Sequence, residues 1–472
     1  MLRGRRLDPM DDLALRITSS AEADRRIQSA VVYVNMAHVV GLYNAGAISK
    51  EVMNKLMQGL SNELSGYPIS YKDEDVHMSL EKDLALKVGL EAGFIGLAKS
   101  RNDQVATAIR LQLRQELLGV MENVLSLIEA ITGKASESIR TFFITFTHLQ
   151  PAQASTGAHW LLSYAWSFLR DLERLKLAYQ MTDMSPLGSA ASAGSIVQVD
   201  RYFEAEALGF SGIVENTIDA VSTRDFIFDS IYAMSSAAVN LSRLSADIVA
   251  YMALGLIDLD DRYVSTSSLM PQKRNTVVAE IVRAKSANII SNLLSAMEIV
   301  RGLNLSYNLD LQEITPKVWA SIDEINDMLK ATAIMIGGLK FNEDRAKEMA
   351  LKGLVTASDV AEYVSIKYGI AFREAHHMVG EAVRNCGETY VKCLVDTLKS
   401  MGINVDVEEL SRMADPISSV ERRSTTGGPH PRESLRQISA IELKVKEFED
   451  FLGLNSRKIE KTYQSLINRG WY

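Results

Sequence analysis

Polar side chains that could bind an anionic substrate and move protons gather in four short segments. They are residues 100–103, 147–153, 267–275 and 307–316, and three of the four contain a proline. Together they supply a histidine, serines, a lysine, arginines, asparagines and glutamines. This set suits a substrate with two or three negative charges and proton transfer by a positioned side chain. It offers no metal-ligand cluster, no thiol nucleophile and no Ser–His–Asp order typical of hydrolases.

Each segment also has an ordinary structural interpretation when it is taken alone. Ser100 and Asn102 are common helix-capping residues, and Asp103 suits a helix N-terminus. His148 could be a hydrogen-bonded structural histidine, and Lys273 could be a solvated surface charge. The functional interpretation therefore rests on the segments occurring together.

Long helices are expected to position these segments. The chain has only nine prolines, which break helix interiors. Apolar residues recur every three or four positions in the stretches 105–128, 227–252 and 276–297. The second stretch has mostly Ala and Ser in between, so other helices can approach it closely, and we expect it at the centre of a bundle. The best strand candidate is Phe142–Phe146.

These patterns predict a mainly α-helical, three-domain chain with a central bundle of long helices. We expect an N-terminal, mostly helical domain at residues 1–99, the long-helix bundle with most of the motifs at 100–345, and a small helical domain at 346–472. A helix of thirty residues is about 45 Å long, which is more than one compact domain needs. We therefore expect the bundle to be completed by other subunits.

The composition is that of a soluble globular protein, with 47% apolar and 23% charged residues among 472. A net charge of −8, with the signs interspersed, argues against nucleic acid as a partner. No apolar run is long enough to cross a membrane, and the basic start of the chain has no apolar core like that of a secretory signal. Cys386 and Cys393 fit no zinc pattern and no disulfide framework, so a cytoplasmic location is expected. No phosphate-binding loop is present, and we expect no cofactor.

The four segments resemble those of the fumarase/aspartase superfamily and, within it, of the argininosuccinate lyase family. Residues 267–275 match the superfamily signature Gly-Ser-Ser-x-Met-Pro-x-Lys-x-Asn from its first serine onward. Residues 100–104 (Ser-Arg-Asn-Asp-Gln), 147–153 and 307–313 (Tyr-Asn-Leu-Asp-Leu-Gln-Glu) are similar to segments of the narrower family. Residues 74–77 (Glu-Asp-Val-His) are among the shorter matches, which cover most of the chain.

The chain also departs from the family pattern at several positions. Asn35 stands where the family has the serine of Ser-x-Ala-His, and residues 96–99 (Gly-Leu-Ala-Lys) replace its His-Thr-Gly-Arg. Thr315 occupies the place of a family lysine, and Lys317 lies two residues further on. Substrate contacts on the N-terminal side are therefore where this chain differs most.

The resemblance implies reversible β-elimination of argininosuccinate to fumarate and L-arginine, the last step of arginine biosynthesis. In such a reaction a base removes a proton from the carbon next to a carboxylate, and an acid protonates the departing nitrogen. By resemblance Ser267 is the base, with Lys273 stabilising its alkoxide. His148 is the expected acid, with Glu280 fixing its tautomer. Asn275 is expected to bind the substrate carboxylate and the enolate-like intermediate.

The resemblance further implies a set of substrate-binding residues: Ser100, Arg101, Asn102, Thr147, Gln153, Tyr307, Gln312, Asn35, Arg224 and Lys317. No metal is expected. Because three subunits of a homotetramer contribute to each site in this superfamily, we expect a homotetramer with shared sites. Two alternatives stay open: another fumarate-releasing lyase, acting on adenylosuccinate or aspartate, and a non-catalytic homologue like the lens crystallins related to these enzymes.

Overall fold

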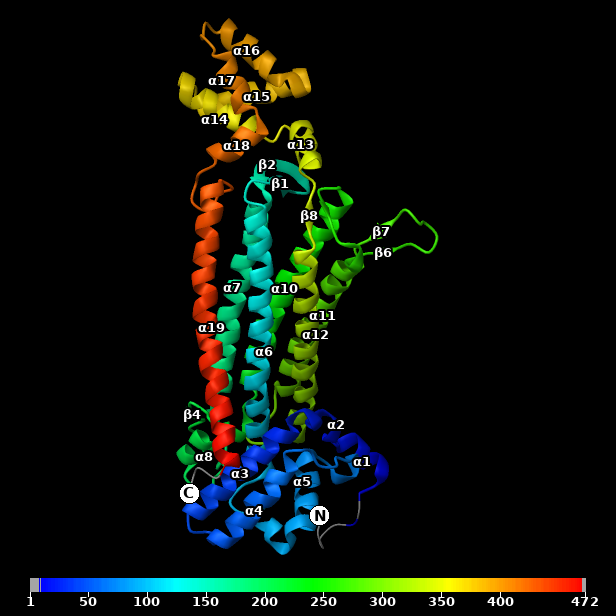
Figure 1. The fold of residues 1–472 in the computed structure, drawn as a ribbon, viewed down its shortest axis with the longest axis vertical. Coiled ribbons are helices and arrows are strands. Elements are labelled where there is room, and N and C mark those ends of the chain that lie inside the picture. The colour runs from blue at the N-terminus through cyan, green and yellow to red at the C-terminus, as the bar shows by residue number, and fades with distance from the viewer. Residues whose placement is uncertain (1–7, 9, 469–472) are drawn as a thin grey trace.

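The chain folds into an elongated helical bundle with a smaller group of helices at each end (Figure 1). The computed structural model describes residues 8 and 10–468. The bundle consists of α6 (Arg101–Glu137), α7 (Gly157–Thr182), α10 (Asp225–Ala253), α11 (Val277–Val300) and α12 (Thr315–Gly337). The mainly α-helical fold is confirmed, and α6, α10 and α11 cover the three stretches in which the sequence predicts long helices. No helix within the described residues is long and apolar enough to cross a membrane.

The N-terminal group of helices packs across the beginning of α6. It contains α1 (Asp12–Thr18), α2 (Ala21–Asp24), α3 (Gln28–Asn44), α4 (Lys50–Glu63) and α5 (Val76–Val88), joined by the 3₁₀ turns η1 (Arg25–Ile27), η2 (Tyr71–Asp73) and η3 (Gly89–Gly96). The short helices α8 (Arg201–Ala207) and α9 (Thr217–Ser222) lie at the same end. Helix α3 packs against both α4 and α6, so it links this group to the bundle.

The C-terminal group lies at the opposite end, and residues 354–414 within it have their own apolar core (Figure 1). It contains α13 (Glu343–Lys352), α14 (Ala357–Tyr368), α15 (Phe372–Cys386), η6 (Gly387–Thr389), α16 (Tyr390–Ser400), α17 (Val407–Met413) and α18 (Pro416–Arg422). The last helix, α19 (Pro431–Ile467), returns along the bundle and packs on α7 and α6. Its apolar residues Ile438, Ile441 and Phe448 form one buried stripe. The predicted unit 346–472 therefore divides between two cores, and the domain boundaries themselves stay a prediction.

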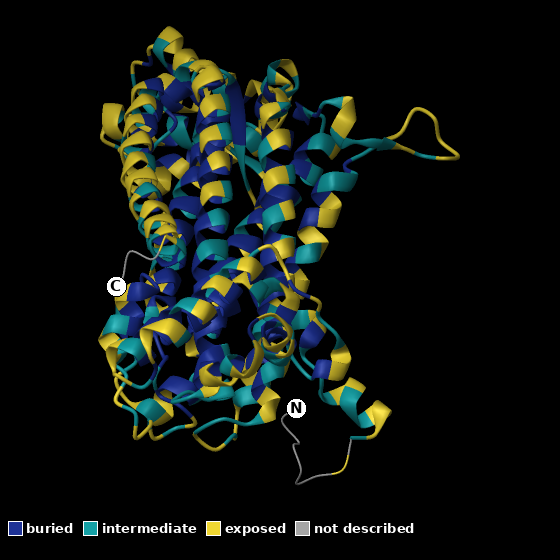
Figure 2. Ribbon diagram, turned by 60° about the horizontal axis from the view of Figure 1, so that its bottom comes forward, coloured by how far each residue is buried: buried dark blue, intermediate teal, exposed yellow. Residues whose placement is uncertain are grey.

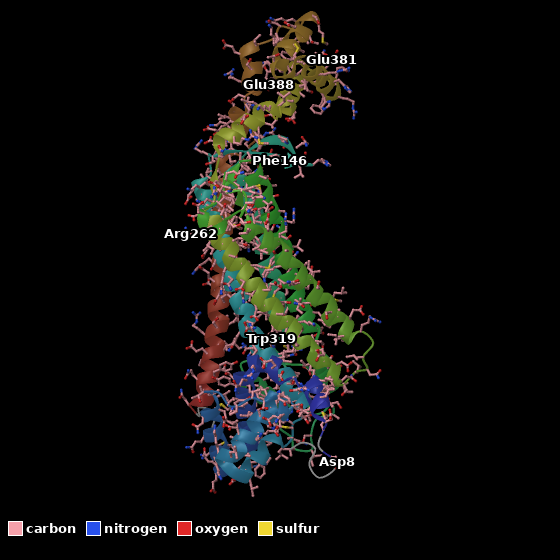
Figure 3. The ribbon with its side chains drawn as sticks, turned by 90° about the vertical axis from the view of Figure 1, so that its right-hand side faces the viewer. Asp8, Phe146, Arg262, Trp319, Glu381 and Glu388 are labelled. Atoms are coloured by element: carbon pink, nitrogen blue, oxygen red, sulfur yellow. A yellow bond between two sulfur atoms is a disulfide. The ribbon has the colours of Figure 1, made fainter. Side chains whose placement is uncertain are left out.

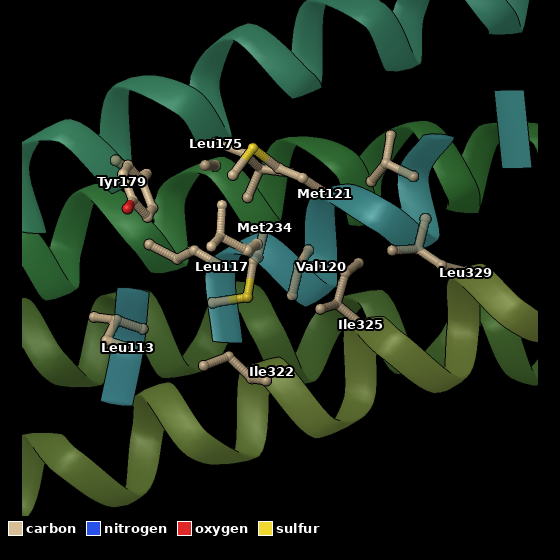
Figure 4. Packing of buried hydrophobic residues seen from close by; sticks show 14 of the residues in the cluster. Leu113, Leu117, Val120, Met121, Leu175, Tyr179, Met234, Ile322, Ile325 and Leu329 are labelled. Carbon is tan, nitrogen blue, oxygen red and sulfur yellow. The ribbon is translucent and has the colours of Figure 1, made fainter. Parts of the chain in front are cut away.

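Helix α6 is buried on more than one side because apolar residues occupy most of its circumference. In Figure 4, Leu117 and Met121 of α6 face Met234 of α10, while Val120 lies towards Ile325 of α12. Each of these side chains is fully buried, which stabilises the fold by roughly 1.5–3 kcal/mol per side chain. A core of this kind holds the ends of the long helices in fixed positions.

The described residues also contain four two-stranded sheets. They are β1–β2 (Phe142–Thr147 and Gln150–Thr156), β3–β4 (Met184–Ser185 and Gly212–Ile213), β5–β8 (Ile257–Asp258 and Lys340–Phe341) and β6–β7 (Ser265–Thr266 and Arg274–Asn275). The pair β3–β4 is parallel and the others are antiparallel. Strand β1 confirms the strand predicted at Phe142–Phe146. Two of these hairpins carry predicted catalytic residues.

The two cysteines form a disulfide, which corrects the sequence-based expectation. Cys386 ends α15, and Cys393 lies in the first turns of α16, with a single turn between the helices. That turn folds the chain back and brings the two Cα atoms to 6.5 Å, which is within the range for a disulfide. Sequence spacing alone did not show this reversal.

Candidate active site

A cavity of about 460 Å³ lies between the N-terminal helices and the beginnings of α6 and α12. It brings together five of the predicted substrate-binding residues: Arg101, Asn102, Arg224, Tyr307 and Gln312. They come from the start of α6, the residue before α10, and the segment around η5 (Leu309–Ile314). Residues more than 200 positions apart in sequence thus line one cavity large enough for a small-molecule substrate.

The N-terminus of α6 presents the first two of these side chains. The Ser100 hydroxyl accepts the Asn102 N–H at 3.4 Å, and the Asp103 carboxylate accepts the Ser100 N–H at 2.9 Å, which makes a capping box. Arg101 lies 3.1 Å from the Asp75 carboxylate, and Asn102 donates to the Ala191 carbonyl at 3.1 Å. Ser100, predicted as a substrate contact, thus serves as the cap that fixes its two neighbours.

Arg224 brings a positive charge to the cavity lining, close to the neutral Tyr307. Arg224 is 2% exposed, donates to the Thr223 carbonyl at 2.7 Å, and forms no ion pair with a carboxylate of the described residues. Its Nε atom has no hydrogen-bond partner among them. Burial lowers the pKa of Arg224 to about 10, and the nearby Tyr307 opposes that shift. A buried guanidinium without a carboxylate partner is well suited to binding a substrate carboxylate.

The cavity lining also includes acidic residues and a histidine that the prediction missed. Asp24, Glu74, Asp75 and His77 line it. Burial raises the pKa of Asp24 to about 7, against the lowering effect of a hydrogen bond from Ser20. His77 is buried, and neither ring nitrogen has a hydrogen-bond partner among the described residues; burial lowers its pKa well below the usual value. The family-like segment 74–77 was the available signal for three of these residues.

The loop with the predicted base lies away from this cavity. Residues Ser267–Lys273 form the tip of the β6–β7 hairpin, which projects from the bundle and is largely exposed (Figures 1 and 2). Arg274 anchors its base through Asp258 at 2.6 Å and Asp261 at 2.8 Å. The hairpin, residues 265–275, is therefore a projecting arm that is anchored at its base; we call it the Ser267 arm.

The Ser267 hydroxyl has a specific local environment within this arm. Its Oγ accepts the backbone N–H groups of Leu269 at 3.3 Å and Met270 at 3.1 Å. Lys273 is exposed on the same loop, Asn275 is half-buried in β7, and Glu280 is exposed in the first turn of α11. Donors aimed at a serine oxygen favour its deprotonated form.

The predicted acid lies in a third place, at the tip of the β1–β2 hairpin. His148 and Leu149 join Thr147 to its strand partner Gln150, and both have left-handed backbone, with φ of 53° and 59°. Two consecutive residues with positive φ in a two-residue turn are typical of a type I′ hairpin. His148, like Thr147 and Gln153, is exposed. Figure 3 shows Phe146 of β1 next to the C-terminal group of helices and Trp319 of α12 next to the N-terminal group, so this hairpin is remote from the cavity.

The remaining two predicted substrate contacts do not line the cavity. Asn35 is fully buried inside α3 and bonds to Lys99 and to the Val31 carbonyl. Lys317 is half-buried in α12, whereas Thr315, at the place of the family lysine, does line the cavity. One chain thus presents three separate groups of predicted site residues.

Comparison with known proteins identifies the family of this chain. A lyase family profile matches residues 4–291, and the profile of the argininosuccinate lyase C-terminal region matches residues 354–421. An argininosuccinate lyase of Methanothrix thermoacetophila is 36% identical, with 99% of this chain and 98% of that protein covered. One of Methanosarcina barkeri is 37% identical, with coverage of 94% and 93%.

Solved structures show the same fold. A crystal structure of EDDS lyase in complex with formate superposes with a TM-score of 0.87 at 26% identity, covering 94% of this chain and 91% of that one. A class II fumarase from Schistosoma mansoni, at 17% identity and a TM-score of 0.72, covers 83% and 90% and shares the fold. With relatives above 30% identity along nearly its whole length, the chain belongs to the argininosuccinate lyase family of the fumarase/aspartase superfamily.

Proposed function

We propose that this enzyme cleaves argininosuccinate to fumarate and L-arginine by β-elimination. The observation that carries the proposal is the cavity, whose lining includes Arg224 as well as Asp24 and Asp75. Argininosuccinate carries carboxylates as well as cationic groups, so a cavity with both signs of charge can orient it. Tyr307 and Gln312 add neutral hydrogen-bonding groups to the same lining.

Ser267 removes the proton from the carbon next to the carboxylate. A serine hydroxyl is a weak base in water, so its alkoxide needs donors that are already in place. The N–H groups of Leu269 and Met270 supply two of them, and Lys273 adds a positive charge when the loop closes. Because the loop is exposed in the free chain, closure over bound substrate is what excludes water from the base.

Substitution of the base separates chemistry from binding. Ser267→Ala should lose at least about a hundredfold in kcat, since proton transfer contributes about that much or more. Equilibrium binding of argininosuccinate, measured by calorimetry, should stay close to that of the wild type because the cavity residues are untouched. Turnover equal to that of the wild type would refute the assignment of Ser267.

His148 protonates the departing nitrogen, and Glu280 orients its imidazole ring. Both side chains are exposed and belong to different parts of the single chain. Asn275 holds the carboxylate next to the reacting carbon while negative charge develops there. These roles need the His148 hairpin, the Ser267 arm and the cavity to meet, which one chain does not allow.

A homotetramer with sites shared between subunits meets this need. Large apolar side chains are exposed along the bundle helices: Tyr232, Val239, Ile281, Ile290, Leu294, Met297 and Ile334. Exposed apolar residues in such number favour burial against another subunit, and a long helical bundle can pair with copies of itself by two-fold symmetry. Light scattering should give four chains per particle, and a stable, fully active monomer would overturn the proposal.

The substrate assignment is tested with a panel of succinyl amines. Purified enzyme receives argininosuccinate, adenylosuccinate, aspartate or EDDS, and fumarate is followed by its ultraviolet absorbance. We expect release from argininosuccinate at a much higher kcat/KM than from the others. Folded, tetrameric enzyme that releases fumarate only from another compound would move the assignment within the superfamily, and no release from any would favour a non-catalytic homologue.

We propose that the enzyme works in the cytoplasm, which cell fractionation tests.

A further inference from the structure

Helix α3 holds the segment that leads into α6 at two points. The His38 Nε2 atom lies 2.7 Å from the Leu97 carbonyl oxygen, and the Lys99 ammonium donates to the Asn35 Oδ1 atom. Asn35 and His38 are both fully buried and lie three residues apart, on the same face of α3. The amide nitrogen of Asn35 is also occupied, since it donates to the Val31 carbonyl at 2.7 Å.

The bond to Asn35 matters because Lys99 has few other partners. The side chain reaches into the interior, and no carboxylate of the described residues lies within ion-pair distance of its ammonium group. Burial lowers the pKa of Lys99 to about 8, while Glu81 and Asp103 oppose that shift from a distance. An interior ammonium that lost its only close acceptor would carry a full desolvation penalty.

The position of Lys99 in the chain connects this bond to the cavity. Lys99 directly precedes Ser100, the cap of α6, and the next two residues, Arg101 and Asn102, line the cavity. Any displacement of Lys99 therefore moves the first turn of α6. Ala98, just before it, has left-handed backbone with φ of 60°, so the entry into α6 is held in a conformation that local preference alone does not favour.

We infer that Asn35 and Lys99 form a positioning pair that fixes the first turn of α6, and with it Arg101 and Asn102, against the cavity. Asn35 acts through Lys99 rather than by contacting the substrate. Both positions are among those at which the sequence departs from the family pattern noted above, and the two residues meet in one contact. The inference rests on the proposed function only in that KM for argininosuccinate is its readout.

A double-substitution cycle tests the pairing. Asn35→Leu removes the acceptor at nearly constant volume, Lys99→Met removes the ammonium, and the combined variant removes both. Each single change leaves one interior polar group without a partner, so we expect KM to rise roughly tenfold, whereas replacing both partners by apolar groups should restore KM to within about threefold of the wild type. The value of kcat should change less than KM, because Ser267 and His148 lie on other segments.

Lys87→Met is the matched control. Lys87 bonds to the buried Glu63 at 2.8 Å in the same group of helices but does not precede α6, so we expect a lower unfolding temperature with an unchanged KM. Effects of the two single changes that multiply in the combined variant would overturn the pairing. A KM rise in Lys87→Met equal to that in Lys99→Met would overturn the positioning role, because it would show a general loss of stability.

The same variants separate failure of the inference from failure of the proposed function. If the wild type does not cleave argininosuccinate, the proposed function fails, and the cycle is then read from the unfolding temperature alone. The combined variant should still be more stable than either single variant. A combined variant less stable than both would overturn the pairing regardless of the substrate.

Discussion

The turn that carries His148 is strained at Leu149, and we predict that relieving this strain raises the stability of the protein and lowers its activity. Leu149 is 81% exposed and has a φ of 59°. A non-glycine residue in the left-handed region costs about 1–2 kcal/mol. Glycine removes that strain but makes the unfolded chain more flexible, which costs roughly 0.5–1 kcal/mol. Leu149→Gly should therefore stabilise the folded protein by at most about 1.5 kcal/mol.

Leu149→Ala is the control, since it shortens the side chain and keeps the strained backbone. Denaturant unfolding at one fixed protein concentration should show Leu149→Gly to be more stable than Leu149→Ala, which in turn should match the wild type. Fumarate release should fall in the glycine variant, because a looser turn no longer holds the His148 imidazole in a fixed direction. Equal stability of the two variants would refute the assignment of strain to this turn.

Two other predictions follow from the cavity and from the C-terminal group of helices. The pKa of Asp24 is raised to about 7, so the folded state binds more protons than the unfolded state between about pH 4 and 7, and stability falls as pH rises through that range. Asp24→Asn should flatten this dependence and stabilise the protein above pH 7. An unchanged pH profile of the free energy of unfolding in Asp24→Asn would contradict this prediction. The Cys386–Cys393 disulfide closes a loop with a sequence separation of 7. Cys386→Ser should therefore destabilise the α15–α16 pair by about 2 kcal/mol while fumarate release persists. A titration of free thiols in the unfolded, unreduced wild type that finds two thiols would disprove the disulfide.

The long helices could be predicted because their causes are local. Apolar spacing and the capping box at Ser100 set the start and the buried face of α6, and these are readable from the sequence. The polar clusters at residues 147–153 and 267–275 likewise indicated breaks between the long helices, and a hairpin lies at each of them; their chemical roles stay predictions. Their separation in space could not be predicted, because it depends on which helix ends meet in the folded chain.

The sequence also could not predict in which direction individual side chains point. Lys317 follows Thr315 by two residues, which on a helix is a turn of about 200°, so only Thr315 lines the cavity. Asn35 stands where the family pattern has a serine, yet its burial follows from how α3 packs on the segment before α6. His77 lies in a matching segment of the sequence. Only the structure shows that neither of its ring nitrogens has a hydrogen-bond partner among the described residues.

Mixed tetramers test most directly whether the active site is shared. His148→Asn and Ser267→Ala should each abolish release of fumarate from argininosuccinate when they are produced alone. Produced together, they form mixed tetramers, and a site that takes His148 from one subunit and Ser267 from another is intact in about a quarter of cases. We predict recovery of up to about a quarter of the wild-type rate. Mixed tetramers as inactive as both parents would contradict the account, because the two residues would then come from one chain.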